Sequence, residues 1–235
     1  MADELGSVLW KAMKNASAVW EYPYQKGFLA PHLVLRSGKH SDRFVDALQY
    51  LSVVSNLTQA ARLLAEKLKR RLLDTEIDWV VGSPMAGIPL ATIIAPMLGA
   101  KRVGFNEKIG GSKELVCRFN LSPGENFLMV EEMTTTGGTP QRGIEAVLKK
   151  NPDADPLPFV GAFLIRCDNY PPDLGGRELV SLVSLPDLGV RYNEWNPLDC
   201  PLCKNGSPLI ENCKQVWSAL LRTMEDPTYP LEPAC

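Results

Sequence analysis

The chain has 235 residues, of which 45% are hydrophobic and 22% are charged, so one domain, or one domain with a small appendage, can bury an ordinary core. The formal net charge of -2 gives no electrostatic reason to expect a nucleic-acid or membrane partner. Residues 1–20 carry early acids and no uninterrupted apolar run, so they match neither a secretory signal nor a membrane anchor. We therefore expect a cytoplasmic globular protein.

Residues 1–50 are expected to form a small cap of helices and an edge hairpin. After this segment, apolar residues from Leu57 to Leu72 recur at helical spacing, which predicts an amphipathic helix with a basic last turn. Short apolar runs follow, and they are typical of strands buried on both faces of a parallel sheet. The expected strands are residues 77–82, 101–106, 115–119, 127–131, 159–167 and 179–185. The pattern predicts an α/β fold with a mainly parallel twisted sheet flanked by helices.

The chain divides into three expected parts. These are an N-terminal cap over residues 1–50, a core over residues 51–190 and a C-terminal appendage over residues 191–235. The appendage contains several cysteines and is expected to end in a helix. That helix would carry Ile210, Cys213, Trp217, Leu220 and Met224 on one face.

The sequence FLMVEEMTTTGGTPQRG, residues 127–143, combines a buried strand with a polar turn. Thr139 and Pro140 are expected as the N-cap and first residue of a helix. The turn offers backbone N–H groups that glycine leaves accessible, threonine hydroxyls and the N-terminus of a helix, and together these groups are suited to binding one phosphate. Glu131 and Glu132 cannot bind a phosphate, but they can accept hydrogen bonds from sugar hydroxyls. A ribose 5-phosphate therefore fits both halves of the sequence.

The segment VEEMTTTGGT resembles the signature of the type I phosphoribosyltransferases. Within that family the chain is most similar to orotate phosphoribosyltransferases, because LVLRSGKHSDRFVDA (33–47) and GSPMAGIPLAT (82–92) match their segments in the same order. The resemblance implies the type I phosphoribosyltransferase fold and a Mg²⁺-dependent enzyme. Such an enzyme transfers 5-phosphoribose from phosphoribosyl pyrophosphate (PRPP) to a nitrogenous base, orotate or a related one, and releases pyrophosphate. It also implies a homodimer.

The resemblance also implies roles for individual residues. Glu131 and Glu132 would contact the ribose hydroxyls, and Lys108 would act from a mobile loop that covers the site, with Lys113 as a second candidate in that loop. The 5-phosphate would be bound by Thr135, Thr136, Gly137, Gly138 and Thr139. The pyrophosphate would lie along Pro84, Met85 and Ala86. The base would be contacted by Arg36, Ser37, Gly38 and Lys39.

Simpler interpretations exist for several of these residues. Lys108 and Lys113 could be ordinary surface lysines, and residues 36–39 could be a polar hairpin turn. Glu132 stands where the family usually has aspartate, and Glu107 where orotate enzymes commonly have arginine. A PRPP-sensing or nucleotide-sensing regulator without chemistry is the alternative function.

The chain contains six cysteines and two histidines. Cys200 and Cys203 have CxxC spacing, and Cys213 follows, so a structural zinc site, a reversible disulfide and inert thiols are all open. No histidine is near these cysteines in the sequence, so a fourth zinc ligand would have to be Cys235 or a strand cysteine. His32 is expected to have a structural or solvent-facing role.

Overall fold

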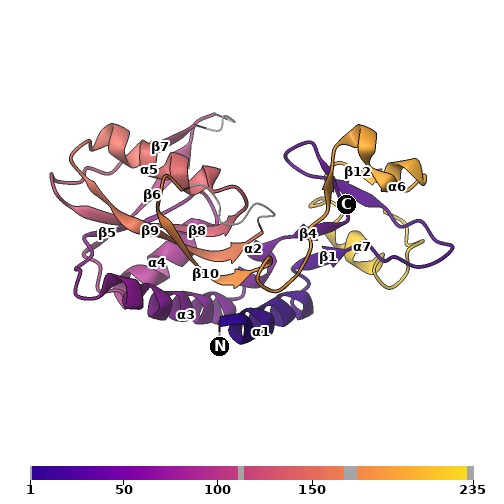
Figure 1. The fold of residues 1–235 in the computed structure, drawn as a ribbon, viewed down its shortest axis with the longest axis horizontal. Coiled ribbons are helices and arrows are strands. Elements are labelled where there is room, and N and C mark those ends of the chain that lie inside the picture. The colour runs from indigo at the N-terminus through magenta and orange to yellow at the C-terminus, as the bar shows by residue number, and fades with distance from the viewer. Residues whose placement is uncertain (1, 111–113, 167–173, 232–235) are drawn as a thin grey trace. The chain divides into compact units, whose positions relative to one another are not determined.

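The computed structural model describes residues 2–110, 114–166 and 174–231, and its contacts divide the chain into two units. The sheet unit comprises Met1–Trp10 and Tyr50–Val190, and the composite unit comprises Lys11–Gln49 and Arg191–Cys235. From the sequence, the N-terminal and C-terminal segments are expected to be separate parts. In the structure, the larger share of the N-terminal segment and the C-terminal segment fold together (Figure 1).

The sheet unit contains a six-stranded sheet in the order β10-β9-β8-β5-β6-β7. All neighbouring strands run parallel except β6 and β7, which form an antiparallel edge. The strands are β5 (Trp79–Gly82), β6 (Arg102–Lys108), β7 (Leu115–Cys117), β8 (Asn126–Thr134), β9 (Asp155–Ile165) and β10 (Glu178–Ser184). This arrangement confirms the predicted α/β fold and mainly parallel sheet. The prediction succeeded because continuous apolar runs are typical of strands whose two faces are both covered by helices.

Helices pack on both faces of this sheet. The helices of the unit are α3 (Val54–Leu72), α4 (Gly87–Met97) and α5 (Gly138–Lys150), and α1 (Ala2–Asn15) and α2 (Ala47–Leu51) span its boundaries. Figure 1 shows α5 on one side of the sheet and α3 and α4 on the other. The apolar face of α3 buries Leu64 and Leu68, as its spacing predicts. On the other side, Ile144 and Val147 of α5 pack in one apolar cluster with Phe127.

The composite unit is built from short strands. β1 (Val19–Glu21) pairs with β4 (Arg43–Val45), and a four-stranded sheet has the order β11-β3-β2-β12. Its strands are β2 (His32–Val34), β3 (His40–Ser41), β11 (Glu194–Trp195) and β12 (Leu209–Ile210). The N-terminal hairpin β2–β3 therefore lies between two strands from the C-terminal segment.

The predicted long C-terminal helix is wrong in extent. The segment instead forms the 3-10 helix η1 (Pro197–Asp199), α6 (Pro201–Lys204) and α7 (Trp217–Arg222). Ile210 lies in β12, and neither Cys213 nor Met224 lies in a helix. Strand pairing with β2 overrides helical spacing here, and Cys213, Trp217 and Leu220 still share one apolar cluster. Within the described ranges, no helix has both the length and the apolar character that crossing a membrane requires.

Candidate active site

The two acids lie where β8 extends past its neighbour β5. Gly82, the last residue of β5, pairs with Val130, whereas β8 continues along β9 to Thr134. The predicted strand ends at Glu131, but in the structure both glutamates lie inside β8. Ligands of open α/β sheets bind at the carboxyl ends of strands, and this step between β5 and β8 is such a place.

The loop after β5 is held against the backbone of β8. The Ser83 amide donates a hydrogen bond of 2.9 Å to the carbonyl of Val130. At Gly87, a Cβ atom would lie 2.7 Å from that same carbonyl oxygen, so only glycine permits this approach. The predicted pyrophosphate loop, Pro84 to Ala86, is thereby brought beside Glu131, and the Met85 side chain is 77% exposed.

The carboxyl group of Glu131 is buried, with only 5% of the residue exposed. Its Oε1 accepts a 3.1 Å hydrogen bond from the Glu132 amide, while Oε2 is buried with no hydrogen-bond partner. Burial, followed by the negative charge of Glu132, raises the pKa of Glu131 to about 8, and the Ser83 hydroxyl and the Lys108 charge oppose this shift. A desolvated carboxyl with a spare oxygen is well suited to ligand hydroxyl donors.

The turn after β8 presents backbone amides and hydroxyls. The Gly137 amide donates to the Thr134 hydroxyl at 3.2 Å, and Gly137 has φ = 82°, a conformation that favours glycine. Thr135 is half-buried and Thr136 is exposed. The first amides of α5, at Gly138 and Thr139, have no acceptor within the helix because of their position.

The helix start is predicted two residues too late. The N-cap is Gly137 rather than Thr139, no side chain caps the helix, and Pro140 is its third residue. Proline is tolerated there because the first-turn amides need no intrahelical acceptor. The left-handed conformation of Gly137 leads the chain directly into the helix. Thr135 and Thr136, with their hydroxyl groups, lie in the turn before it.

Arg142 is a cation that the sequence analysis missed. Its Nη2 donates to the Thr139 hydroxyl at 3.4 Å, and a Cβ on Gly138 would lie 3.1 Å from Nη1. Its Nε is buried without a hydrogen-bond partner. Arg142 follows Thr139 by three residues on the helix, so its guanidinium lies over the turn. This spacing is the feature of the sequence from which the position of Arg142 could have been predicted.

Lys108 is the last residue of β6 and is exposed. Its charge acts on Glu131, so the two side chains share one electrostatic environment. Glu107, which stands at the position of a common arginine, forms an ion pair of 2.7 Å with Arg118. Lys113 lies outside the described residues.

The predicted base-binding residues belong to the composite unit. Arg36, Ser37, Gly38 and Lys39 form the exposed turn between β2 and β3. The Gly38 amide donates to the Leu35 carbonyl at 2.8 Å, and Lys39 approaches Glu194 at 3.6 Å. This geometry is that of a polar hairpin turn, and the role of these residues in binding a base stays a prediction.

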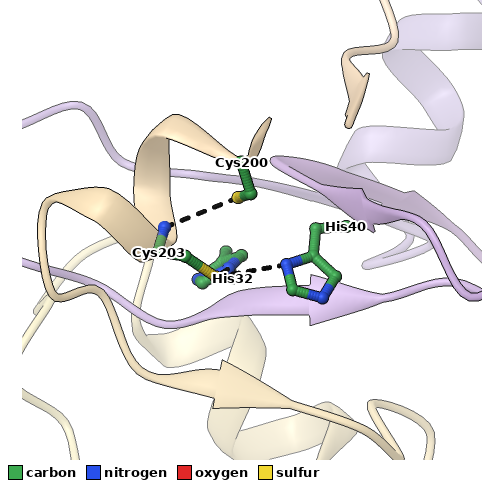
Figure 2. A group of neighbouring side chains, drawn as sticks. All are labelled: His32, His40, Cys200 and Cys203. Carbon is green, nitrogen blue, oxygen red and sulfur yellow. Dashed lines mark hydrogen bonds between the residues drawn. The ribbon is translucent and has the colours of Figure 1, made fainter. Parts of the chain in front are cut away.

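The cysteines assemble differently from the predicted zinc set. Cys200 and Cys203 lie together, but their neighbours are His32 and His40, and Cys213 is not in this group (Figure 2). Cys213 is buried in the apolar cluster around Trp217, which also includes Cys200, but it is not one of the four side chains that could share a metal ion. Sequence spacing could not reveal this grouping of histidines and cysteines, because the histidines approach the cysteines only through the pairing of strands that are distant in the sequence. Cys167 and Cys235, the other possible ligands named from the sequence, lie outside the described residues.

Relatives and solved structures match the chain over most of its length, although no family model matches it. It is 32% identical over 183 residues to an orotate phosphoribosyltransferase of Desulforamulus reducens, covering 78% of this chain and 88% of the relative. It is 34% identical over 177 residues to one from Thermotoga maritima, covering 75% and 87%.

Among solved structures, orotate phosphoribosyltransferase from Aeropyrum pernix matches with a TM-score of 0.58 at 23% identity, covering 77% of this chain and 95% of that one. Adenine phosphoribosyltransferase from Saccharomyces cerevisiae matches with a TM-score of 0.52 at 18% identity, covering 74% and 99%. These two likenesses establish the fold, and the identity and coverage of the curated relatives establish the family. The chain has the type I phosphoribosyltransferase fold and belongs to the orotate phosphoribosyltransferase family.

Proposed function

We propose that the protein transfers the 5-phosphoribosyl group of PRPP to orotate with Mg²⁺ and releases pyrophosphate. The observation that carries the proposal is the buried Glu131 carboxyl, with its partnerless Oε2, on the strand that leads into the glycine-containing turn. The curated relatives named as orotate phosphoribosyltransferases support orotate as the base. The base nitrogen forms a bond to C1 of the ribose, and the bond from C1 to the pyrophosphate oxygen breaks with its electron pair leaving on pyrophosphate.

The 5-phosphate would lie at the turn between β8 and α5. The amides of Gly138 and Thr139, together with the hydroxyls of Thr135 and Thr136, would donate hydrogen bonds to its oxygens. Arg142, which already contacts the Thr139 hydroxyl, would add a positive charge. Binding this remote phosphate would fix the ribose relative to the reacting base.

The ribose hydroxyls would donate to the carboxylates of Glu131 and Glu132. The spare Oε2 of Glu131 would gain the partner that it lacks in the protein alone. Glutamate at position 132 is one methylene longer than the aspartate usual in the family, so its contact with the sugar would be differently spaced. The negative charge of Glu132 would also favour the positive charge that develops on the ribose ring.

The pyrophosphate would lie along the backbone of Pro84 to Ala86. The donor set fits Mg²⁺, because Glu131 and Glu132 offer carboxyl oxygens, one of them buried without a partner, and a cation bound there would favour the ionised form of Glu131. Bound with PRPP, Mg²⁺ would neutralise charge on the departing pyrophosphate. Lys108, whose charge reaches Glu131, would stabilise the same leaving group from the end of β6 and help exclude water.

The test is pyrophosphate release from PRPP and Mg²⁺ with a panel of orotate, uracil, adenine and hypoxanthine. We expect turnover with orotate and at least tenfold less with the other bases, since a polar site discriminates strongly, about 10⁴-fold in favourable cases. If only another base of the panel gave turnover, that base and not orotate would be the acceptor. PRPP binding without turnover on any base would contradict the enzyme and favour a PRPP-sensing regulator.

Lys108→Ala tests the leaving-group role. We expect kcat to fall by about 10²-fold, the loss typical of removing one transition-state donor, while PRPP binding weakens less. Lys69→Ala, which removes an exposed lysine of α3, is the matched control and should leave kcat unchanged. Unchanged turnover in Lys108→Ala would remove this residue from the mechanism.

We also propose that the enzyme is a cytoplasmic homodimer, as the family resemblance implies. Light scattering of the purified protein tests the assembly, and a mass near twice 25.9 kDa is expected. A mass that stays at one chain across protein concentrations would contradict the dimer.

A further inference from the structure

Four potential metal ligands converge in the composite unit, and none of them is a residue assigned to phosphoribosyl transfer. His32 and His40 come from β2 and β3, and Cys200 and Cys203 come from the start of α6. Their ligand atoms all lie within 4.8 Å of one another. Figure 2 shows the four side chains directed toward one another from the two strands and the short helix. The chain contains no other histidines.

The strand register explains why the histidines meet. Val34 is opposite His40, so His32, two residues earlier in β2, projects from the same face as a diagonal neighbour of His40. Their ring centroids are 5.3 Å apart. β11 and β12 flank the hairpin on opposite edges, and the connection between them carries α6. That connection crosses the sheet on the face where the two imidazoles lie.

The nitrogen and sulfur atoms are already close to the size of a tetrahedral site. The Cys203 sulfur lies 3.2 Å from His32 Nε2 and 3.2 Å from His40 Nδ1. Zinc bonds of about 2.0–2.3 Å require ligand atoms roughly 3.3–3.8 Å apart. The four side chains therefore need only small rotations to surround one ion.

His32 is held in the tautomer that a metal requires. The Ser207 hydroxyl donates its single hydrogen to the Ala30 carbonyl at 2.6 Å. It can therefore only accept from His32 Nδ1, which lies 2.9 Å away. This leaves the lone pair of Nε2 facing Cys203. Such an outer hydrogen bond is typical of metal-binding histidines.

Burial and charge select the metal. His32 and Cys200 are fully buried, with 0% exposure. A divalent cation with two thiolates and two neutral imidazoles is neutral overall, so it can be buried without a further counter-ion. The Cys203 amide also approaches the Cys200 sulfur at 3.5 Å, which would stabilise a thiolate there. A tetrahedral set of two sulfurs and two nitrogens favours zinc.

We propose that His32, His40, Cys200 and Cys203 bind one structural zinc ion that fastens the β2–β3 hairpin to the C-terminal segment. The site replaces the set with Cys213 considered from the sequence. It is independent of PRPP chemistry, because none of its residues belongs to the proposed catalytic machinery. Its role is to stabilise a unit whose strands are only two or three residues long.

The first test is the zinc content of full-length protein purified without added metal and under reducing conditions. We expect about one equivalent per chain, and less than about a tenth in Cys203→Ser and in His40→Asn. Cys213→Ala and Cys117→Ala are matched controls, because both remove a buried cysteine outside the group, and they should retain the zinc. Zinc loss in Cys213→Ala equal to that in Cys203→Ser would overturn the assigned ligands.

The second test does not depend on the folding of any variant. Wild-type protein stripped with a chelator is titrated with Co²⁺, and we expect one equivalent to produce thiolate-to-cobalt charge-transfer bands and intense visible bands of tetrahedral cobalt. Absence of these bands, together with less than about a tenth of an equivalent of zinc in untreated protein, would overturn the proposal. So would a Cys200–Cys203 disulfide in the native protein, detected under non-reducing conditions as a proteolytic peptide that contains both of these cysteines and is two hydrogens lighter than its reduced form.

Discussion

The sheet unit and the composite unit use different means to form a core. The sheet unit buries long apolar strands beneath α3, α4 and α5, and Phe127, Leu128 and Met129 in sequence are each 0–1% exposed. The composite unit has strands of two or three residues and buries polar groups such as His32, Ser41 and Thr223. Apolar strands supply most of the first core, whereas the second combines a smaller apolar cluster with hydrogen bonds between distant segments and, we propose, a metal.

The largest predicted effect is in the core of the sheet unit. Phe127→Ala should lower the free energy of unfolding by about 3–5 kcal/mol, because it leaves a cavity in a closely packed cluster. Denaturant unfolding measures this loss, with Val54→Ala as the control because Val54 is 74% exposed. A loss below about 1 kcal/mol would show that apolar packing is not what supports this unit.

The second effect concerns pH and the buried acid of the sheet unit. The pKa of Glu131 is raised from 4.5 to about 8 in the folded protein, so the unfolded state releases this proton first. The stability of the native state should therefore fall as pH rises from about 4.5 to about 8. Glu131→Gln, which stays neutral, should be more stable than wild type at about pH 9 by up to a few kcal/mol, since a tenfold change in proton affinity is worth about 1.4 kcal/mol.

Thermal unfolding of wild type and Glu131→Gln across this pH range measures the difference. Glu66→Gln is the control, because Glu66 is an exposed acid of α3 in the same unit. Parallel stability profiles for wild type and Glu131→Gln would mean that the carboxyl is not desolvated.

A smaller effect is expected from a buried hydrogen bond in the composite unit. Trp20 Nε1 donates to the Thr223 hydroxyl at 3.1 Å, and this bond joins residues 203 positions apart. Trp20→Phe should cost about 1–3 kcal/mol, because a buried hydroxyl loses its donor. Unfolding followed by denaturant measures the cost, and Thr223→Val in a double-mutant cycle isolates the bond. Additive effects in the cycle would show that the hydrogen bond contributes nothing.

The smallest effects should come from surface ion pairs in either unit. Arg71 and Glu178 pair at 2.8 Å in the sheet unit, and Arg43 and Glu21 pair at 2.9 Å in the composite unit. Glu178→Gln and Glu21→Gln should each change the free energy of unfolding by less than about 1 kcal/mol, because water screens the exposed Arg71–Glu178 pair and still reaches the half-buried Arg43–Glu21 pair. A larger loss only for Glu21→Gln, measured at low and high salt, would show that the composite unit relies on its surface charges as well.

The sequence predicts the sheet unit well because its patterns are local. The run from Phe127 follows a strand rule that needs no knowledge of distant partners, and the polar turn to Gly138 carries its own signature. The error at Thr139 arose because a left-handed Gly137 can begin a helix without a side-chain cap. Arg142 was missed because its position over the turn becomes evident only once the helix start is known.

The composite unit was harder to predict because its structure depends on pairing between distant segments. Ile210 is spaced as though on a helix with Trp217, yet it pairs in β12 with Leu33 of β2. The histidines are remote from the CxxC pair in the sequence, so no spacing rule connects them. Short strands carry too few residues for a period of two to be recognised.

The interleaving of the composite unit has a consequence for the order of synthesis. Cys203 lies 163 residues after His40, and the whole β5–β10 sheet is encoded between them. A chain that grows at about 5–20 residues per second would make the two histidines roughly 10 to 30 seconds before their sulfur partners. During that interval the sheet unit can fold, whereas the β2–β3 hairpin still lacks β11 and β12, the strands that flank it. A released chain truncated before Cys200 should therefore contain a folded sheet and a hairpin that is still accessible to proteases and chaperones.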